Sequence, residues 1–442
     1  MKSLIINFKK TAPLCLVFLI VGLPSCDVDE VLDPNGSSLE GVINNASRSD
    51  LQTVVTGIES LLRKEIGFYY DLTSIVGRDL YFFTGSDPRF TGEIMGKGDS
   101  QLDNAGFYST RPYAGRYRTV KNANILIAAV NNNANDLSLS GEEVNGFLGF
   151  AKTIQAYELH LALNLQFENG IRLDVSDPDN LGPFVSYEEG LRGIMSLLDE
   201  AAGELASAGT AFPFSLSAGF DGFNTPSTFL QFVNALAARI AIYQKNKSAA
   251  LGFLNKSFMN MDGDFNTGPA RTYSTAGGEE SNPLFRPRNQ AEALVAQPNF
   301  VTDLDPNDLR GSKIIERDEP ITLDGLTGTH DVVTFPSLSS PIPYINNEEL
   351  ILIFAEANIG TDNAKAVQAL DVIRTRNGLQ PYSGATSDAA LIDEMLSQRR
   401  FSLYGQGHRW VDMRRYDRLD QLPLDRDGDN VWKQMLRPVS EN

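Results

Sequence analysis

The densest group of chemically active side chains in this chain lies near its C-terminus, in the run 408–415. The run contains His408 and Asp412, residue types that acid–base catalysis uses, together with three arginines. We interpret it instead as structural. Trp410 should bury its indole between helices, and the arginines should pair with Asp412 or with carbonyl groups at helix ends. The predicted structural signature is His408, Arg409, Trp410, Asp412 and Arg415.

The sequence lacks the short motifs of common hydrolytic and phosphate-binding enzymes. It contains no Gly-x-Ser-x-Gly elbow, no His-Glu-x-x-His pair and no phosphate loop. Its three histidines, His160, His330 and His408, are far apart along the chain. We therefore predict that the protein is not an enzyme and needs no cofactor. The 56 acidic residues leave a glycosidase as an alternative, because that chemistry needs only two carboxyl groups.

The run 425–430 alternates acidic residues as a calcium loop does. An EF-hand loop needs glycine at its sixth position and glutamate at its twelfth. Here Gly428 is fourth and Leu436 is twelfth. We predict an acidic turn and no metal site, with one bound divalent cation as the alternative.

The N-terminus is typical of an exported lipoprotein. Lys2, Lys9 and Lys10 precede an apolar stretch at 12–22, and Cys26 ends the run Leu-Pro-Ser-Cys. We predict a signal peptide at 1–25, lipid attachment at Cys26 and a flexible tether at 26–48. The apolar stretch, about 11 residues long, is too short to span a bilayer, so the lipid would be the anchor. An ordinary secreted protein with a chance cysteine is the alternative.

Cysteine content and charge exclude other classes. The only other cysteine, Cys15, lies inside the predicted signal peptide, so the mature chain has no pair for a disulfide. Helix packing must then supply the stability. The formal net charge of −18 repels phosphates, which argues against a nucleic-acid partner.

Helical patterns dominate the rest of the chain, and we predict a predominantly all-α fold. Expected helix starts are Ser49, Pro112, Ser140, Ser186 and Pro226, and further helices are expected at 248–258, 346–359, 362–377 and 387–404. Residues 260–340 are rich in glycine, proline, asparagine and aspartate, and should form a loop-rich region with a few short strands. Pairs of helices joined by short turns indicate tetratricopeptide-like units, although the sequence has no clean period.

Several C-terminal motifs occur in an order that is distinctive. They are Pro341–Tyr344, Glu348–Ala357, Ala369–Gly378, Gln398–Arg400 and Gly407–Arg415. Together with the Cys26 motif, they resemble the SusD/RagB family of outer-membrane nutrient-binding lipoproteins. The chain departs from the family at Gln398, Ser402 and Gln406, where relatives often carry glutamate. The predicted domain is 49–442, with a loop-rich insertion at 260–340 and the signature region at 341–442.

The resemblance implies a role as well as a fold. It implies a lipoprotein anchored in the outer membrane, facing the cell exterior, beside a SusC-like TonB-dependent transporter. Such a protein captures an oligosaccharide, or sometimes a peptide, and delivers it to the transporter. The alternatives are a surface glycoside hydrolase and a structural surface lipoprotein without a transport role.

A sugar site needs flat apolar surfaces beside polar side chains, and it favours loops on a rigid scaffold. The stretch with Tyr81, Phe83, Asp87 and Arg89 has this composition. Tyr273, in a glycine-rich stretch, and Trp432, after the acidic turn, are further candidates. We predict these six residues as ligand contacts.

Overall fold

The computed structural model of the protein describes residues 39–441, and helices dominate them, which confirms the predicted class. The predicted signal peptide and Cys26 lie outside the described residues. The α-helices are α1 (Leu39–Asn44), α2 (Arg48–Leu61), α3 (Ile66–Val76), α4 (Phe107–Asn133), α5 (Gly141–Gln166), α6 (Tyr187–Leu205), α7 (Pro226–Tyr243), α8 (Lys247–Leu254), α9 (Pro298–Asp303), α10 (Asn347–Asn358), α11 (Asn363–Arg376), α12 (Asp388–Ser402) and α13 (Arg409–Arg415).

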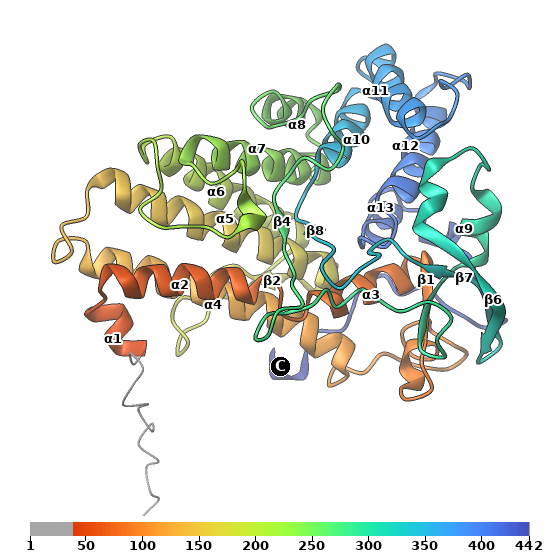
Figure 1. Ribbon diagram of the computed structural model, residues 1–442, viewed down its shortest axis with the longest axis horizontal. Coiled ribbons are helices and arrows are strands. Elements are labelled where there is room, and N and C mark those ends of the chain that lie inside the picture. Colours follow the sequence, from red (N-terminus) through yellow and green to blue (C-terminus); the bar gives the residue numbers. More distant parts are fainter. Residues whose placement is uncertain (1–38, 442) are drawn as a thin grey trace, which may run out of the picture. The chain divides into compact units, whose positions relative to one another are not determined.

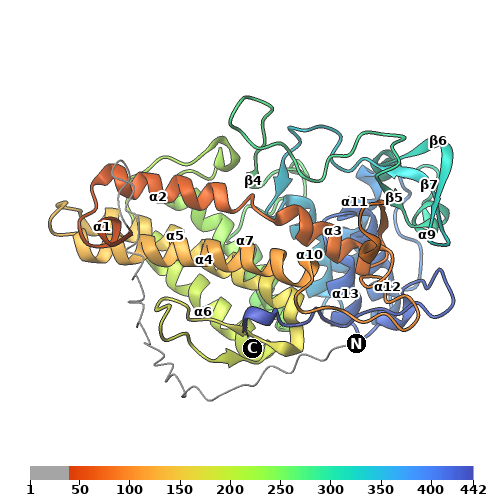
Figure 2. The same cartoon turned by 90° about the horizontal axis from the view of Figure 1, so that it is seen from below.

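Helices that follow one another in the chain are mostly neighbours in space. Figures 1 and 2 show α2, α4, α5, α6, α7 and α8 packed in succession, and α10, α11 and α12 continue from α8. A separate hydrophobic cluster joins α10, α11 and α12 around Leu352, Leu370 and Met395. The tetratricopeptide-like character of these pairs stays a prediction.

Local capping explains where several helices begin. Ser140 with Glu143 and Ser186 with Glu189 form the expected capping boxes, each with reciprocal side-chain and backbone hydrogen bonds. Helix α2 begins at Arg48, because Ser47 rather than Ser49 accepts the hydrogen bond from the Asp50 backbone. Helix α1 also lies within residues 26–48, so folded structure extends into the stretch predicted as a tether.

The start of α4 differs from the prediction at Pro112. The helix begins at Phe107, and Pro112 lies in its second turn, where it cannot donate the usual backbone hydrogen bond. Tyr108 and Tyr113 on either side are almost completely buried. Burial of these aromatic side chains offsets the missing hydrogen bond. The rule that proline begins a helix does not take such burial into account.

The predicted loop-rich region contains most of the strand structure. The strands are β1 (Leu80–Phe83), β2 (Ile171–Arg172), β3 (Phe184–Val185), β4 (Ala270–Arg271), β5 (Ala293–Ala296), β6 (Ile314–Leu323), β7 (Leu326–Val332) and β8 (Ile342–Pro343). Four of them form an antiparallel sheet in the order β1-β5-β7-β6. In β1–β5 pairing, Leu80 lies opposite Ala296. The sheet thereby brings residues 80–83 beside a segment that is about two hundred positions later in the chain.

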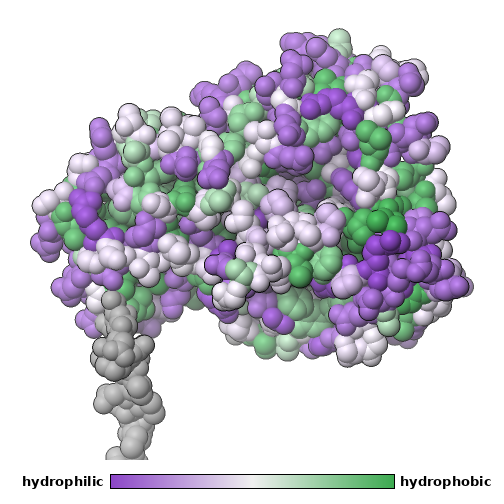
Figure 3. Space-filling view, viewed as in Figure 1, coloured by the Kyte–Doolittle hydropathy of each residue, from purple (hydrophilic) through white to green (hydrophobic). Residues whose placement is uncertain are grey.

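Hydrophilic residues predominate on the face seen in Figure 3, and apolar residues occur there in small groups. This agrees with the acidic composition of the chain. Among residues 39–441, no helix combines the length and the apolar character that crossing a bilayer requires.

Helix α13 is held against α3 by Trp410, which has no exposed surface. Its indole nitrogen donates a hydrogen bond to the carbonyl of Trp432 at 2.8 Å. The approach is close enough that a Cβ added to Gly77 would lie 2.9 Å from the backbone nitrogen of Trp410. Trp410 therefore joins α13, α3 and the C-terminal segment.

We expect Trp410→Ala to lower the free energy of unfolding by about 3–5 kcal/mol, because it leaves a large cavity and an unpaired carbonyl. Urea unfolding followed by circular dichroism measures this change. The matched control is Leu424→Ala, at a residue that is 57% exposed, and it should change the value by less than about 0.5 kcal/mol. Equal stability of the Trp410→Ala variant and the wild type would contradict the structural role.

Candidate functional site

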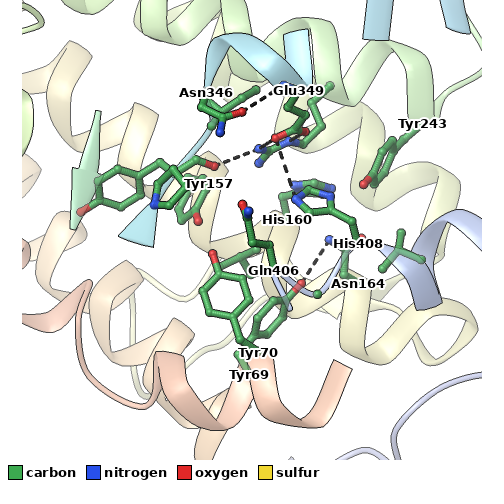
Figure 4. Close-up of a pocket in the computed structure, with 17 residues that line it drawn as sticks. Tyr69, Tyr70, Tyr157, His160, Asn164, Tyr243, Asn346, Glu349, Gln406 and His408 are labelled. Carbon is green, nitrogen blue, oxygen red and sulfur yellow. Dashed lines mark hydrogen bonds and ion pairs between the residues drawn. The ribbon is translucent and has the colours of Figure 1, made fainter. Parts of the chain in front are cut away.

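A buried polar chamber lies beneath the predicted signature. Figure 4 shows side chains from α3, α5, α7 and α10 and from the segment before α13 pointing into it. Its volume is about 20 Å³, which is enough for one water molecule and far too little for a nutrient. The chamber is therefore part of the scaffold.

The chamber contains a buried ion pair between Arg239 and Glu349. Two hydrogen bonds join the side chains, from Nε to Oε1 at 2.7 Å and from Nη2 to Oε2 at 2.6 Å. Burial alone would raise the pKa of Glu349, but the charge of Arg239 and the hydrogen bonds that it donates outweigh burial, and the pKa is lowered. Burial lowers the pKa of His408 to about 4, against the attraction of Glu349. The histidine is thus neutral at neutral pH, while the carboxylate stays ionised and paired.

The arginines of the signature make structural contacts. Arg415 joins Asp412 and Glu356, each at 2.8 Å, and Asp412 also accepts from Arg399 at 2.7 Å. Arg409 donates to the carbonyl of Gly77 at 3.1 Å. All of these groups are bonded to neighbouring elements, although Arg415 and Glu356 also line an open cleft of about 910 Å³.

Gln398 and Ser402, where we expected relatives to carry glutamate, both contact the buried side chain of Arg310. Arg310 donates to the Ser402 hydroxyl at 3.0 Å and to the Gln398 carbonyl at 3.3 Å. Its charge is balanced by Asp308, at 2.6 Å. The buried arginine therefore has a carboxylate partner that does not depend on acidic residues at 398 or 402.

Two open clefts have room for a ligand, of about 930 and 910 Å³, and the larger one contains two of the predicted ligand contacts, Asp87 and Arg89. The walls of the larger cleft come from the start of α3, the start of α4, the segment after β1 and the segment 279–292. A drug-sized ligand typically occupies a pocket of this order, about 300–1,000 Å³. We call this space the main cleft.

Arginine side chains lie over phenylalanine rings in the main cleft. The guanidinium carbon of Arg111 is 4.1 Å from the centre of the Phe68 ring, and that of Arg89 is 4.7 Å from the centre of Phe107. Arg286 lies over Phe82 at 5.3 Å. These stacks are flat surfaces with hydrogen-bond donors at their edges.

Carboxylates fix the orientation of these guanidinium groups. Asp87 accepts from Nε and Nη2 of Arg89 at 2.9 and 2.7 Å, and Glu65 accepts from the same two atoms of Arg111 at 2.9 and 3.1 Å. Both pairs use two parallel hydrogen bonds, which hold the planar groups in place. The hydrogen bond from Arg89 is the largest effect on the pKa of Asp87 and lowers it. The main cleft therefore offers fixed donors and acceptors side by side.

Comparison with known proteins finds a family match in the C-terminal part of the chain. Residues 339–438 match the model of the SusD family. No curated protein sequence matches the chain.

Solved structures of the SusD superfamily share the fold. A SusD superfamily protein of Bacteroides vulgatus is 16% identical, with a TM-score of 0.66 over 89% of this chain and 96% of that one. One of Parabacteroides distasonis is also 16% identical, with a TM-score of 0.65 over 88% and 96%. A SusD-like carbohydrate binding protein of B. vulgatus is 15% identical, with a TM-score of 0.63 over 84% of both chains.

The structure divides the predicted ligand contacts into two groups. Asp87 and Arg89 line the main cleft. Tyr81 and Phe83 are buried in β1 with their rings stacked, and neither lines the cleft. The neighbouring Phe82 lines it instead, because side chains of a strand alternate between its two faces. Tyr81 and Phe83, which we expected to contact a ligand in this stretch, therefore pack in the core, and Phe82 faces the cleft.

The two remaining candidates also lie outside the lining of the main cleft. Tyr273 is buried, and burial raises the pKa of its phenol to about 12. Trp432 is half-buried and donates its indole N–H to the carbonyl of Glu93 at 2.7 Å. In this structure both support the scaffold rather than present a free ring to a ligand.

Sequence reasoning missed Phe68, Phe107, Arg111 and Arg286, all of which line the main cleft. Three of them lie in helices, where the sequence pattern alone indicates helix packing and does not distinguish residues that line a cleft. No sequence signal marked Phe68, because the left-handed backbone of Glu65 (φ 58°), which separates two helical segments, is seen only in the structure. Arg286 lies in a loop and had no signal either.

In the acidic turn at 425–430, the side chain of Arg426 pairs with acidic residues, including Asp429 of the turn itself. The Arg426 side chain donates to Asp429 at 3.0 Å and to Asp324 at 2.8 Å. Within residues 39–441, no group of three or more histidine, cysteine or acidic side chains is arranged to hold a metal ion.

Asp71, at the wall of the main cleft, provides a pH-dependent test of this geometry. Burial raises its pKa to about 6, and the charge of Arg286 opposes this only in part. The folded state then keeps a proton that the unfolded state, with a pKa of about 3.9, releases earlier. The free energy of unfolding should therefore fall as pH rises from about 4 to 6.

Asp71→Asn should remove this contribution, on the order of 2–3 kcal/mol between pH 4 and 7. Urea unfolding at several pH values, for the variant and the wild type, measures the difference. Asp393→Asn, at an exposed ion pair with Arg418, is the matched control and should leave the pH profile as it is. Parallel profiles for Asp71→Asn and the wild type would show that Asp71 is not the titrating group.

Proposed function

We propose that this protein binds oligosaccharide in the main cleft at the cell surface and passes it to a SusC-like TonB-dependent transporter. The observation that carries the proposal is the set of arginine–phenylalanine stacks beside fixed carboxylates. Sugars have apolar C–H faces and many hydroxyl groups. They therefore need flat surfaces together with paired donors and acceptors. The carbohydrate-binding description of the B. vulgatus relative supports this choice of ligand.

Binding without catalysis is the function that we favour. The Asp87 and Glu65 carboxylates are committed to arginines through two hydrogen bonds each. Asp71 has a raised pKa, as a general acid needs, but it lies beside Arg286 at 3.6 Å and is buried. Binding thus uses Asp87, Glu65 and Asp71 as they stand, whereas hydrolysis by these three residues would require freeing them from their arginines.

The anchor and the partner complete the proposal. Lipid on Cys26 would hold the protein at the outer membrane, facing the exterior. The folded structure described here begins at Leu39, so a short segment would separate it from the lipid. This placement would let the binding domain stay close to a transporter in the same membrane.

Binding should be lost when the Arg89 platform is removed. We expect Arg89→Ala to weaken the binding of an oligosaccharide by about tenfold or more, because it removes a flat surface and leaves Asp87 unpaired. A glycan array finds the ligand, and calorimetry measures its dissociation constant. Lys433→Ala is a matched control, because its exposed ion pair with Glu168 lies outside the main cleft.

Three results would contradict this part of the proposal. Absence of binding to any glycan would reject the ligand class. Unchanged affinity of the Arg89→Ala variant would reject the main cleft as the site. Release of shorter sugars during incubation with purified protein would favour a surface glycoside hydrolase.

The transport role predicts a partner. Purification of the full-length chain from its native outer membrane in mild detergent should recover a TonB-dependent barrel in a near-equimolar amount. Cys26→Ser should abolish labelling with palmitate and reduce recovery of the barrel, because the protein would no longer be held at the membrane. Recovery of the lipidated protein without any barrel, from cells that express one, would favour a structural surface lipoprotein.

A further inference from the structure

We propose that the main cleft selects uncharged oligosaccharides and discriminates against glycans that carry carboxylate or sulfate groups. This inference rests on the proposed function and names its ligand class more narrowly. It follows from how the charges of the cleft are arranged.

Four of the five cationic side chains that line the main cleft are already paired with carboxylates, and the fifth, Arg63, has no ion pair among the described residues. Arg89 pairs with Asp87 at 2.7 Å, Arg111 with Glu65 at 2.9 Å, and Arg286 with Asp71 at 3.6 Å. Lys64 forms an ion pair with Glu280. Arg63 donates to the carbonyl of Thr272 at 3.3 Å and interacts with the charge of buried Glu59.

Two further carboxylates of the main cleft, Glu279 and Glu292, are exposed and have no ion pair among the described residues. Thr84 donates its hydroxyl to Glu292 at 3.4 Å. Acidic side chains in the lining therefore outnumber basic ones. The whole chain adds to this effect, since its formal net charge is −18.

An anionic ligand could accept from Arg89 or Arg111 only where a carboxylate already neutralises most of the charge, and it would lie close to the unpaired carboxylates of the cleft. Breaking a bidentate pair leaves its carboxylate without a partner, which is costly. A neutral hydroxyl group has neither problem. It can accept from Nη1 of Arg89 or Arg111, which the hydrogen bonds to Asp87 and Glu65 leave unused, and it can donate to a carboxylate.

The experiment is a glycan array of matched pairs, followed by calorimetry on the mature chain. Each pair has the same backbone with and without a uronic acid, a terminal sialic acid or a sulfate. Where a pair of glycans binds, we expect the dissociation constant of the neutral member to be at least tenfold lower than that of the acidic member at low salt. Raising salt from about 25 to 500 mM should narrow this ratio, because screening weakens repulsion between charges.

Charge variants test the cause of the discrimination. Glu279→Gln combined with Glu292→Gln should raise the affinity for acidic members relative to their neutral partners by several-fold. Glu168→Gln, outside the main cleft, should leave that ratio unchanged. Equal or tighter binding of acidic members would overturn this inference while leaving the proposed function in place.

Discrimination that is the same at both salt concentrations and in the charge variants would also overturn it, since shape rather than charge would then be responsible. An array without any binding glycan would instead reject the proposed function, and this inference with it.

Discussion

Buried pairs of arginine and carboxylate side chains are the interaction on which the rest of this structure depends. Arg239–Glu349 joins α7 to α10, Arg399–Asp412 joins α12 to α13, and Arg116–Glu158 joins α4 to α5. Removing one partner of such a pair is strongly destabilising, because the other is left as an uncompensated charge. The pairs therefore favour these helix contacts, in a part of the chain, residues 39–441, that contains no cysteine to form a disulfide.

Helix α3 connects this scaffold to the main cleft. Its Tyr69 and Tyr70 face the buried chamber, whereas Phe68 and Asp71 line the cleft. Trp410 packs α13 against the same helix from a third side. The proposed ligand site is thus built on a helix that is fixed on several faces, and this gives the arginine–phenylalanine stacks a rigid support.

The sequence predicts what depends on neighbouring residues. The capping boxes at Ser140 and Ser186 and the burial of Trp410 follow from local patterns. The main cleft was predicted only at Asp87 and Arg89, because its other parts come from segments far apart in the chain. The stacking of Arg286 over Phe82 depends on the pairing of β1 with β5, which no local pattern contains. Pro112 is a second case: a local rule places proline at the start of a helix, but α4 begins at Phe107, because the burial of Tyr108 and Tyr113 extends it.

The way in which segment 279–292 is attached has a consequence for how the protein can change. It meets the helices through Lys64–Glu280 and Arg286–Asp71, and Asn282 donates to the carbonyl of Ser340 at 2.7 Å. The helix-joining pairs lie elsewhere. Leu284 and Asn282 of the segment are buried, whereas most of its other side chains are exposed or partly exposed. A change of those other side chains can therefore reshape this wall of the main cleft without removing an ion pair that joins two helices.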